Sequence, residues 1–236
     1  MTRAELKQSS KDQLRGNWGW AVGLSFVAWA VVYIINDIIS YAQYGNDIAY
    51  RTVKTIAGGQ LQESVKINPF GGIVSIILNL AIMIIGWSVL YTILEFRDNG
   101  NKPNVFKGVF SGFMDGRFPT TFLTSLLTGI FTYLWTCLLI IPGIVKSYSY
   151  SMAPYIMKDY YTSGKMKPEA TEAITASRRL MDGHKAELFV LDLSFIGWWL
   201  LGVITCGIGM LWVIPYYRQT RANFYRNLAG NQFLNN

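Results

Sequence analysis

The stretch PEATEAITASRRLMDGHKAELFVLDLSFIGWW, residues 168–199, decides the fold that the sequence predicts. Pro168 suits the first turn of a helix, and Gly183 supplies a left-handed stop after it. An apolar run follows at 188–204, interrupted by only two polar residues, one of which is Asp192. The stretch therefore predicts an amphipathic helix that leads directly into a helix apolar enough to enter a membrane. Small and apolar residues at helical spacing form one face of the amphipathic helix: Ala170, Ala173, Ile174, Ser177 and Met181.

The composition points to a membrane protein. Of 236 residues, 51% are hydrophobic and only 15% are charged, whereas soluble domains carry about 25% charged residues. The net charge of +7 is also typical of nucleic-acid binding. We expect no nucleic-acid partner, because the positive charge follows the ends of the apolar runs, as membrane topology requires. Anionic lipid headgroups are the expected partner of this charge.

Apolar runs predict six transmembrane helices, since about 20 residues span a bilayer. Pro142 and Gly143 are interpreted as a turn between two spans, rather than as a kink within one. With a turn, both termini and the segments 95–118 and 158–185 share one side, which then carries most of the basic residues. The positive-inside rule therefore places both termini in the cytoplasm. The six runs lie at about 18–40, 73–94, 120–141, 144–157, 188–204 and 208–224.

The predicted fold is an all-α membrane protein of three hairpins, each preceded by a cytoplasmic amphipathic helix. Residues 1–230 form a single integral membrane domain, and 231–236 are expected to be a frayed tail. Thr2 and Glu5 match a capping box, and Asn104 can cap the second amphipathic stretch. The longest loop is expected at 41–70.

The three hairpins are interpreted as a degenerate triplication. Each amphipathic stretch ends in a glycine, and so does each return segment. The alternative is that any hairpin protein that obeys the positive-inside rule shows this arrangement. The proposed units are 2–100, 103–164 and 168–230, and the glycines are Gly16, Gly116 and Gly183, then Gly100, Gly164 and Gly230.

Three segments carry a resemblance to a known family: LKQSSKDQLRGNWGWAV (6–22), IPGIVKSYSYSMAPYIMKD (141–159) and EAITASRRLMDGHKAELFVLDLSFIGWWLLGVITCGIGMLWVIPYY (172–217). They resemble an uncharacterised bacterial integral membrane family, domain of unknown function number nine-hundred-and-seventy-five. The pattern around Pro142 is also distantly similar to the membrane domain attached to some glycerophosphodiester phosphodiesterases. The resemblance implies a multipass protein of the bacterial cytoplasmic membrane, mostly in Gram-positive bacteria, and it brings no catalytic residues.

Asp192 is the main intramembrane polar candidate. A carboxylate within a membrane span is costly, and such residues are functional candidates by default. The alternative is a structural hydrogen bond to a neighbouring helix, or a water-lined vestibule. We favour the structural interpretation, because no partner is expected at the same depth. Lys146 is expected near the opposite membrane face and is not paired with Asp192.

A second group of residues is expected at the level of the lipid headgroups. Anionic phosphates gather there, and arginine can hold a phosphate through two parallel hydrogen bonds. The apolar face formed by Ala173, Ile174 and Met181 is expected to meet the apolar boundary of the membrane. The headgroup or interface residues are Arg178, Arg179, His184 and Lys185.

Several residues are predicted to serve helix packing or turns. Gly19 and Gly23 form a GxxxG pair that would allow close approach of two helices. Pro142 and Gly143 are assigned to the turn, and Gly183 is assigned to the helix stop.

The sequence favours no enzymatic function. No catalytic constellation surrounds His184, no phosphate-loop or dinucleotide fingerprint is present, and one histidine with two scattered cysteines makes a zinc site improbable. No cofactor is therefore expected. The favoured function is a non-enzymatic protein that organises anionic lipid or a membrane protein partner. The alternative is a small transporter or channel with a polar site near Asp192, which requires a polar, water-accessible cavity that reaches this residue.

Overall fold

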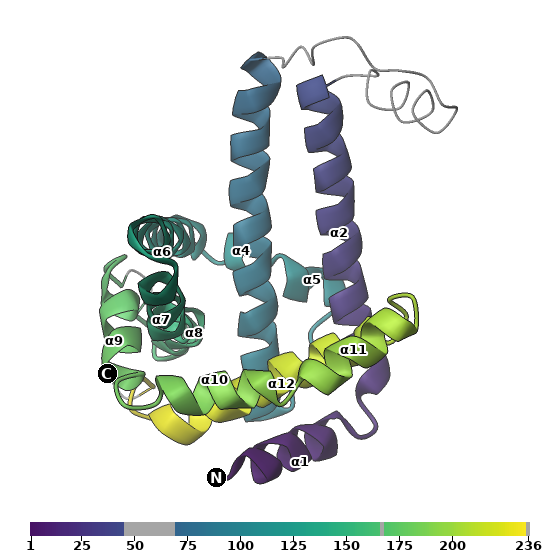
Figure 1. Cartoon of the computed structure of the whole chain (residues 1–236), viewed down its shortest axis with the longest axis vertical. Helices are drawn as coiled ribbons and strands as arrows, with labels where there is room; N and C mark the ends of the chain where they lie inside the picture. Colours follow the sequence, from purple (N-terminus) through teal and green to yellow (C-terminus); the bar gives the residue numbers. More distant parts are fainter. Residues whose placement is uncertain (45–68, 166–167, 235–236) are drawn as a thin grey trace.

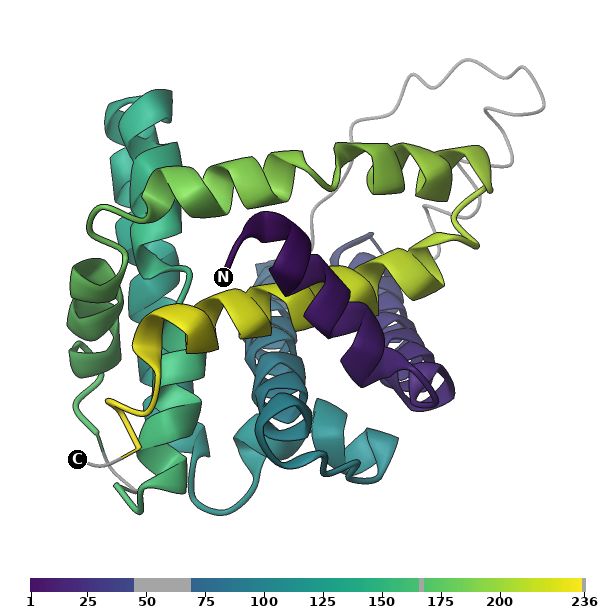
Figure 2. The same ribbon diagram turned by 90° about the horizontal axis from the view of Figure 1, so that it is seen from below.

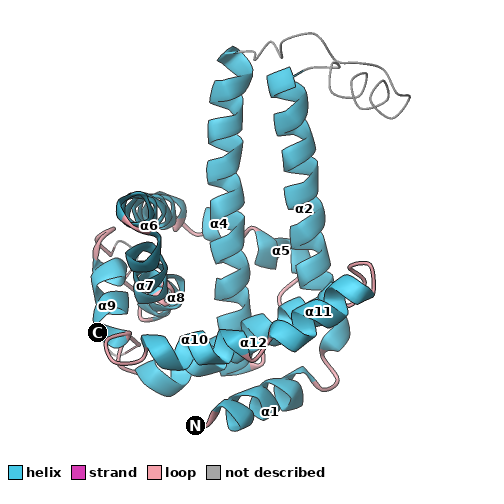
Figure 3. Ribbon diagram, in the orientation of Figure 1, coloured by secondary structure: helices cyan, strands magenta, loops and turns pink. Residues whose placement is uncertain are grey.

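The structure, a computed structural model, describes residues 1–44, 69–165 and 168–234 (Figure 1). Every regular element within these ranges is a helix, as Figure 3 shows, and the predicted all-α class is confirmed. The elements are α1 (Arg3–Leu14), α2 (Trp18–Tyr44), α4 (Pro69–Asn99), α5 (Val105–Val109), the 3₁₀ turn η1 (Ser111–Phe113), α6 (Phe118–Leu138), α7 (Ile140–Tyr150), α8 (Ala153–Thr162), α9 (Glu172–Leu180), α10 (Lys185–Leu193), α11 (Ile196–Ile204) and α12 (Met210–Ala229).

Three helical arms project from one packed region (Figures 1 and 2). Arm 1 is α2 with α4, arm 2 is α6 with α7, and arm 3 is α10 and α11 with the first half of α12, residues 210–217. We call the packed region the base: it consists of α1, α8, α9, residues 218–229 of α12 and the adjoining ends of the arm helices. The N-terminus lies at the base, where its amine is 3.0 Å from Asn227 Oδ1 of α12. Leu234, the last described residue, lines a hollow of the base together with Asp98 and Asp159.

Helix α1 begins with the predicted capping box. Thr2 Oγ1 accepts a hydrogen bond from the Glu5 N–H, and the Glu5 carboxylate accepts one from the Thr2 N–H. These bonds satisfy two donors that a helix start leaves free. The buried face of the helix packs against α12, where Asn223 Nδ2 donates to Ser10 Oγ at 2.9 Å. That face carries Leu6, Ser10 and Leu14, all three of which are buried.

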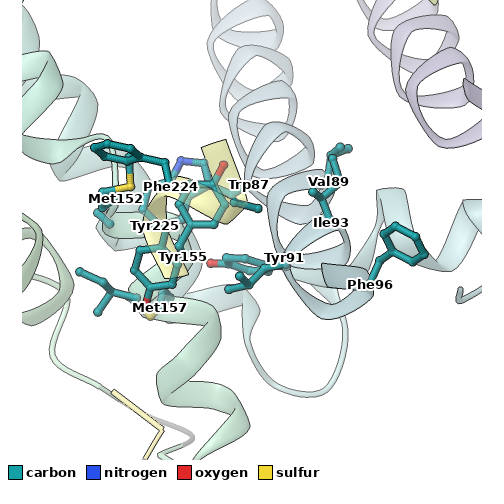
Figure 4. Close-up of a cluster of buried hydrophobic side chains, with 14 of the residues drawn as sticks. Trp87, Val89, Tyr91, Ile93, Phe96, Met152, Tyr155, Met157, Phe224 and Tyr225 are labelled. Carbon is teal, nitrogen blue, oxygen red and sulfur yellow. The ribbon is translucent and has the colours of Figure 1, made fainter. Parts of the chain in front are cut away.

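The core of the base is built from aromatic and methionine side chains (Figure 4). Tyr155 of α8 stacks on Tyr225 of α12 with ring centroids 5.2 Å apart. Tyr91 of α4 meets Tyr161 of α8 edge to face at 6.1 Å, which is a favourable aromatic geometry. Because α4, α8 and α12 all contribute to it, this core ties the arms together.

Arm 1 consists of two long helices that pack side by side. At its base end, the Trp20 indole donates to the Pro103 carbonyl at 3.0 Å, and Asn104 caps α5 as predicted, by accepting from the Phe106 N–H. Most of the predicted 41–70 loop lies outside the described residues, while α2 continues to Tyr44 and α4 begins at Pro69.

Arm 2 reverses direction at Leu139, whose extended backbone separates α6 from α7. The turn predicted at Pro142 and Gly143 is therefore wrong by three residues, and both residues lie in the first turn of α7. Proline fits there because the N–H that it lacks would have no helical partner. A Cβ at Gly143 would lie 2.6 Å from Thr136 Cα, so only glycine permits this close approach of α7 to α6.

Arm 3 contains an interruption that the sequence does not predict. The apolar run 188–204 forms two helices, and Ser194 and Phe195 lie between them. Phe195 is fully buried against the rings of Tyr216 and Tyr217, with centroids 5.1 and 5.2 Å away. Lys7 Nζ donates to the Ser194 carbonyl at 2.9 Å and so satisfies one acceptor that the interruption leaves free.

The described residues contain four segments long and apolar enough to cross a membrane, so the prediction of six is wrong. The predicted span 144–157 divides between α7 and α8, and α8 is buried in the base. The predicted span 208–224 lies in α12, whose second half carries arginines and packs into the base. Hydropathy identifies apolar segments but does not distinguish a short buried helix from a membrane span. The four segments are Trp18–Gln43, Pro69–Asn99, Phe118–Leu138 and Lys185–Ile204.

The arms point in different directions. Helices α2 and α4 run along the longest axis, α6 is seen end-on in Figure 1, and α10 with α11 runs across that view; Figure 2 shows α6 along its length. A flat membrane that arm 1 crosses would therefore run alongside arms 2 and 3 in this arrangement. The structure is not a parallel bundle of three transmembrane hairpins.

Helix α9 begins at Glu172, four residues later than the predicted start at Pro168. Gly183 follows it with a φ of +80°, which confirms the left-handed stop. Ala173, Ile174, Ser177 and Met181 of the predicted face are buried against α7 and α8, whereas Ala170 lies before the helix and is half-buried. The prediction that this face meets the membrane is therefore wrong: Ala173, Ile174 and Met181 are 0%, 3% and 0% exposed.

Ser177 explains why α9 packs at this position. Its hydroxyl donates to the Ser149 carbonyl at 2.8 Å and accepts from the Met152 N–H at 3.2 Å. These two backbone groups flank the break between α7 and α8. Ser177 thus satisfies buried groups that the interrupted helix leaves without a helical partner.

Glycines serve different purposes from those predicted for Gly19 and Gly23. A Cβ at Gly19 would meet nothing within 4 Å, and one at Gly23 would meet only a Val105 side-chain atom at 3.7 Å. Within the described chain, neither glycine is therefore at a close contact between helices, and the GxxxG pair stays a prediction. The glycines that end the segments of the proposed units all have positive φ: Gly16, Gly100, Gly116, Gly164, Gly183 and Gly230. Glycine adopts this conformation without strain. The triplication itself stays a prediction.

The tail is ordered further than its composition predicts. Phe233 is 8% exposed and meets the ring of Tyr160 edge to face at 6.0 Å. This contact holds the tail on α8, so the prediction of a frayed segment from residue 231 onward is wrong for Phe233. Residues 235–236 lie outside the described part.

Candidate functional site

A cleft of about 410 Å³ lies between α7, α9 and the start of α10. We call it the basic cleft. Lys146 of α7, Arg178 and Arg179 of α9, and Lys185 of α10 line it, together with Ser149, Thr175 and Asp182. It thus has four cationic side chains against one carboxylate. Three of the four predicted headgroup residues come together here: Arg178, Arg179 and Lys185.

Local structure positions these cations. The buried face of α9 turns Arg178 and Arg179 outward, where both are exposed, and the left-handed Gly183 redirects the chain so that Lys185 begins α10 beside them. Arg178, Arg179 and Lys185 form no ion pair or side-chain hydrogen bond with any residue that the structure describes. Unpaired cations gathered in a cleft create a positive potential that favours an anionic ligand.

Lys146 and His184 lie elsewhere than predicted. Lys146, expected near the opposite membrane face, joins the basic cleft, and its ammonium lies 4.5 Å from the ring centroid of Trp135. His184 lines a neighbouring hollow, where its Nδ1 is 3.2 Å from Glu187 Oε1. The packing of α7 against α9 explains the position of Lys146, because it brings residue 146 to the basic segment.

Asp192 has partners that the sequence analysis did not find. Its carboxylate accepts hydrogen bonds from the Tyr148 hydroxyl at 3.1 Å and the Tyr217 hydroxyl at 3.0 Å. Arg221 lies 4.0 Å from the carboxylate and donates to the Tyr217 hydroxyl at 2.9 Å. Tyr217 and Arg221 are four residues apart, which places both side chains on the same face of a helix. This spacing is the feature of the sequence that could have indicated a polar cluster here. These bonds support the structural interpretation of Asp192.

A buried ionic cluster connects α4, α8 and α12 in the base. Arg226 binds Asp159 through two parallel bonds of 2.9 Å, and it also contacts Asp98. The Tyr225 hydroxyl donates to Asp159 at 2.6 Å. Burial raises the pKa of the Asp159 carboxyl, while the hydrogen bonds from Arg226 and Tyr225 act in the opposite direction. Burial lowers the pKa of Arg226, but the bonds and charges of Asp159 and Asp98 outweigh it, so that this pKa lies above its ordinary value.

The described residues contain no group of three or more histidine, cysteine or acidic side chains that could hold a metal ion. Cys137 and Cys206 are both free and exposed. What the cations of the basic cleft can do chemically is recognise an anionic group.

The family model described as "Protein of unknown function (DUF975)" matches residues 1–146 and 137–232 of the chain. No curated protein and no solved structure matches this chain.

Proposed function

The chain belongs to the DUF975 family, and we propose that it is a non-enzymatic membrane protein whose base holds anionic lipid headgroups. The observation that carries the proposal is the basic cleft, whose arginines and Lys185 form no ion pair or side-chain hydrogen bond with any other residue that the structure describes. The apolar surface of the arms supports it, because soluble proteins rarely leave such surfaces uncovered. On the three arms, Ile76, Ile141 and Ile204 are 63%, 75% and 75% exposed.

We infer the depth of each arm from helix length. A bilayer has a hydrocarbon core of about 30 Å. Helices α2 and α4 have 27 and 31 residues, and a helix of 27 residues is about 40 Å long. Helix α6 has 21 residues and is long enough to cross by itself, but its return helix α7 has only 11, about 16 Å. In arm 3 the interruption at Ser194 and Phe195 divides the apolar segment into α10 and α11 of nine residues each, about 14 Å each. Neither arm thus has an uninterrupted pair of helices long enough to cross and return. We therefore propose that arm 1 crosses the bilayer and that arms 2 and 3 are embedded in the leaflet next to the base.

The base then faces the cytoplasm of a bacterial cell. The positive-inside rule places short basic segments on the cytoplasmic side, and the basic cleft and the N-terminus belong to the base. Embedded arms would bring the base close to the headgroup layer, where its cations can reach phosphate groups.

The native cysteines test this arrangement. Cys137 lies near the tip of arm 2 and Cys206 at the tip of arm 3. We expect both to resist a membrane-impermeant thiol reagent in intact cells, because their tips remain in the cytoplasmic leaflet. A membrane-permeant maleimide should label them. The measurement is the mass shift of the purified protein after each treatment.

Tyr41→Cys, in a chain with Cys137→Ser and Cys206→Ser, provides the control, because Tyr41 is 63% exposed at the far end of arm 1. This cysteine should react with the impermeant reagent. Labelling of Cys137 or Cys206 from outside would mean that arms 2 and 3 cross the membrane, and our assignment of depth would be wrong.

Arg178→Gln with Arg179→Gln tests the basic cleft. Each basic residue near an anionic lipid surface contributes about 1 kcal/mol, so the double change should weaken anionic-lipid binding by about 30-fold. Helix α9 should stay folded, because its apolar face packs in the base. Native mass spectrometry after gentle extraction would measure the retained anionic phospholipid.

Arg3→Gln with Lys107→Gln removes the same charge from exposed positions outside the cleft, and this control should retain lipid as the wild type does. Equal lipid loss in both double variants would show that net charge, rather than the cleft, controls binding. Unchanged lipid in the Arg178 and Arg179 variant would refute the proposal.

The alternative of a small transporter requires a polar cavity that reaches Asp192. A cavity of about 420 Å³ is lined by Tyr217 and Arg221, the partners of Asp192, but not by Asp192 itself. The Asp192 oxygens already accept two hydroxyl groups. We therefore propose lipid binding in preference to transport through a site at Asp192.

A further inference from the structure

The cavity next to the Asp192 network contains a cation without a partner. We call it the Arg218 cavity; it has a volume of about 420 Å³ and lies where α4, α6, α7, α8 and α12 meet. None of its lining residues belongs to the basic cleft, so it is a separate site. Trp87 and Tyr155, both labelled in Figure 4, form part of its wall.

Arg218 is the unusual residue of this cavity. Its Nη1 atom is buried and has no hydrogen-bond partner, and the side chain forms no ion pair with any described residue. The other two arginines on the same part of α12 are paired: Arg221 with Tyr217 and Asp192, and Arg226 with Asp159 and Asp98. Burial lowers the pKa of Arg218, which reflects the cost of removing its charge from water.

Arg218 is half-buried, and a guanidinium nitrogen that is buried with neither a hydrogen-bond acceptor nor a counter-charge is unfavourable unless a ligand supplies them. Guanidinium presents a planar set of donors that matches the oxygens of a phosphate or carboxylate. A ligand anion at Nη1 would complete the hydrogen bonding that the chain itself leaves incomplete.

The hydroxyl groups of the wall show what else the ligand should carry. Each donates to a carbonyl of its own helical segment: Thr128 to Thr124, Thr132 to Thr128, Ser147 to Ile144 and Ser151 to Tyr148, at 2.7–2.8 Å. A hydroxyl that donates to the backbone still has lone pairs that accept hydrogen bonds. The cavity therefore offers a cation for an acidic group and acceptor oxygens for donors on the same ligand.

We propose that the Arg218 cavity binds the anionic group of a phosphate ester that carries hydroxyl groups. A cavity of this volume falls within the range of small-ligand sites, about 300–1,000 Å³, and it can hold a polar headgroup or a small soluble ester. The phosphate binds Arg218, and the ligand hydroxyls donate to the threonine and serine oxygens.

The test uses the full chain in lipid nanodiscs and two probes. Glycerol phosphate is added in solution to nanodiscs of zwitterionic lipid, and phosphatidylglycerol is incorporated into a second set. Calorimetry measures binding of the soluble ester, and native mass spectrometry measures retained phosphatidylglycerol. Binding of glycerol phosphate identifies a free ester as the ligand. A lipid headgroup is identified when glycerol phosphate does not bind but phosphatidylglycerol is still retained by a chain with Arg178→Gln and Arg179→Gln, in which the basic cleft is disabled.

Arg218→Gln should reduce binding of the effective probe at least about tenfold, as expected for loss of a charged hydrogen bond. Arg178→Gln with Arg179→Gln is the matched control and should leave binding of glycerol phosphate unchanged, because the basic cleft does not border this cavity. Loss of the basic cleft would thus leave the Arg218 cavity intact, so the experiments distinguish a failure of the proposed lipid-binding function from a failure of this inference.

Thermal unfolding provides a second readout that does not depend on activity. Arg218→Met should raise the apparent melting temperature of the ligand-free protein, because it removes an unpaired buried charge. It should also abolish the stabilisation that the probe gives to the wild type.

Equal binding of a probe to the wild type and to Arg218→Gln, or no binding of either probe, would overturn the proposal. Inorganic phosphate that binds as tightly as glycerol phosphate would overturn the assigned role of the hydroxyl groups.

Discussion

Asp159→Asn is expected to destabilise the protein by about 3–5 kcal/mol, the cost of breaking a buried ion pair by removing one charge. Asp159 and Arg226 are 2% and 6% exposed at their side chains, so water cannot replace the lost partner. Arg226 donates two bonds to this carboxylate, and Tyr225 donates a third. The loss of stability should appear as a lower unfolding midpoint, measured in detergent by circular dichroism.

Two further variants separate the ion pair from general damage to the base. Asp115→Asn changes a carboxylate that is 70% exposed and 3.7 Å from Arg117, and exposed pairs contribute only about 0–1 kcal/mol. Asp159→Asn combined with Arg226→Met removes both charges and should cost less than the sum of the two single changes. Additive losses would contradict the assigned pairing.

Phe195→Ala is expected to cost about 3–5 kcal/mol, as complete truncation of a buried aromatic residue does. Phe195 is fully buried, contacts Tyr216 and Tyr217, and lies 4.3 Å below the ammonium of Lys7. Its loss removes the contacts that hold the junction of α10 and α11 on α12 and on Lys7 of α1. Proteolysis should then cut between α10 and α11 before any other site, and the unfolding midpoint should fall.

Phe106→Ala serves as the matched control, because Phe106 is 61% exposed and its truncation should change stability by no more than about 0.5 kcal/mol. A wild-type midpoint for Phe195→Ala, with no new cleavage at the interruption, would show that arm 3 is held by other contacts.

Some features could be predicted because their causes are local. The capping box of Thr2 and Glu5, the cap at Asn104 and the left-handed stop at Gly183 each depend on a few neighbouring residues. The buried face of α9 also follows from helical spacing. The sequence could not predict what covers that face, since lipid and protein both accept apolar side chains.

The candidate sites depend on contacts between distant segments. Arg178, Arg179 and Lys185 lie close in sequence and were predicted together, whereas Lys146 joins them only because α7 packs on α9. The partners of Asp192 are 44 and 25 residues away along the chain. An isolated sequence gives no distance between such positions.

By itself, the sequence determined the all-helical class, the family, a few helix caps and stops, and the apolar character of the arms. These properties follow from composition, periodicity and local capping, which each segment carries within itself. Tertiary structure alone decided that α8 and the second half of α12 form a protein core, that Asp192 is paired, and that Arg218 Nη1 has no partner among the described residues. The physical reason is that burial and hydrogen-bond satisfaction are properties of pairs of segments, and the pairing is fixed only when the whole chain packs.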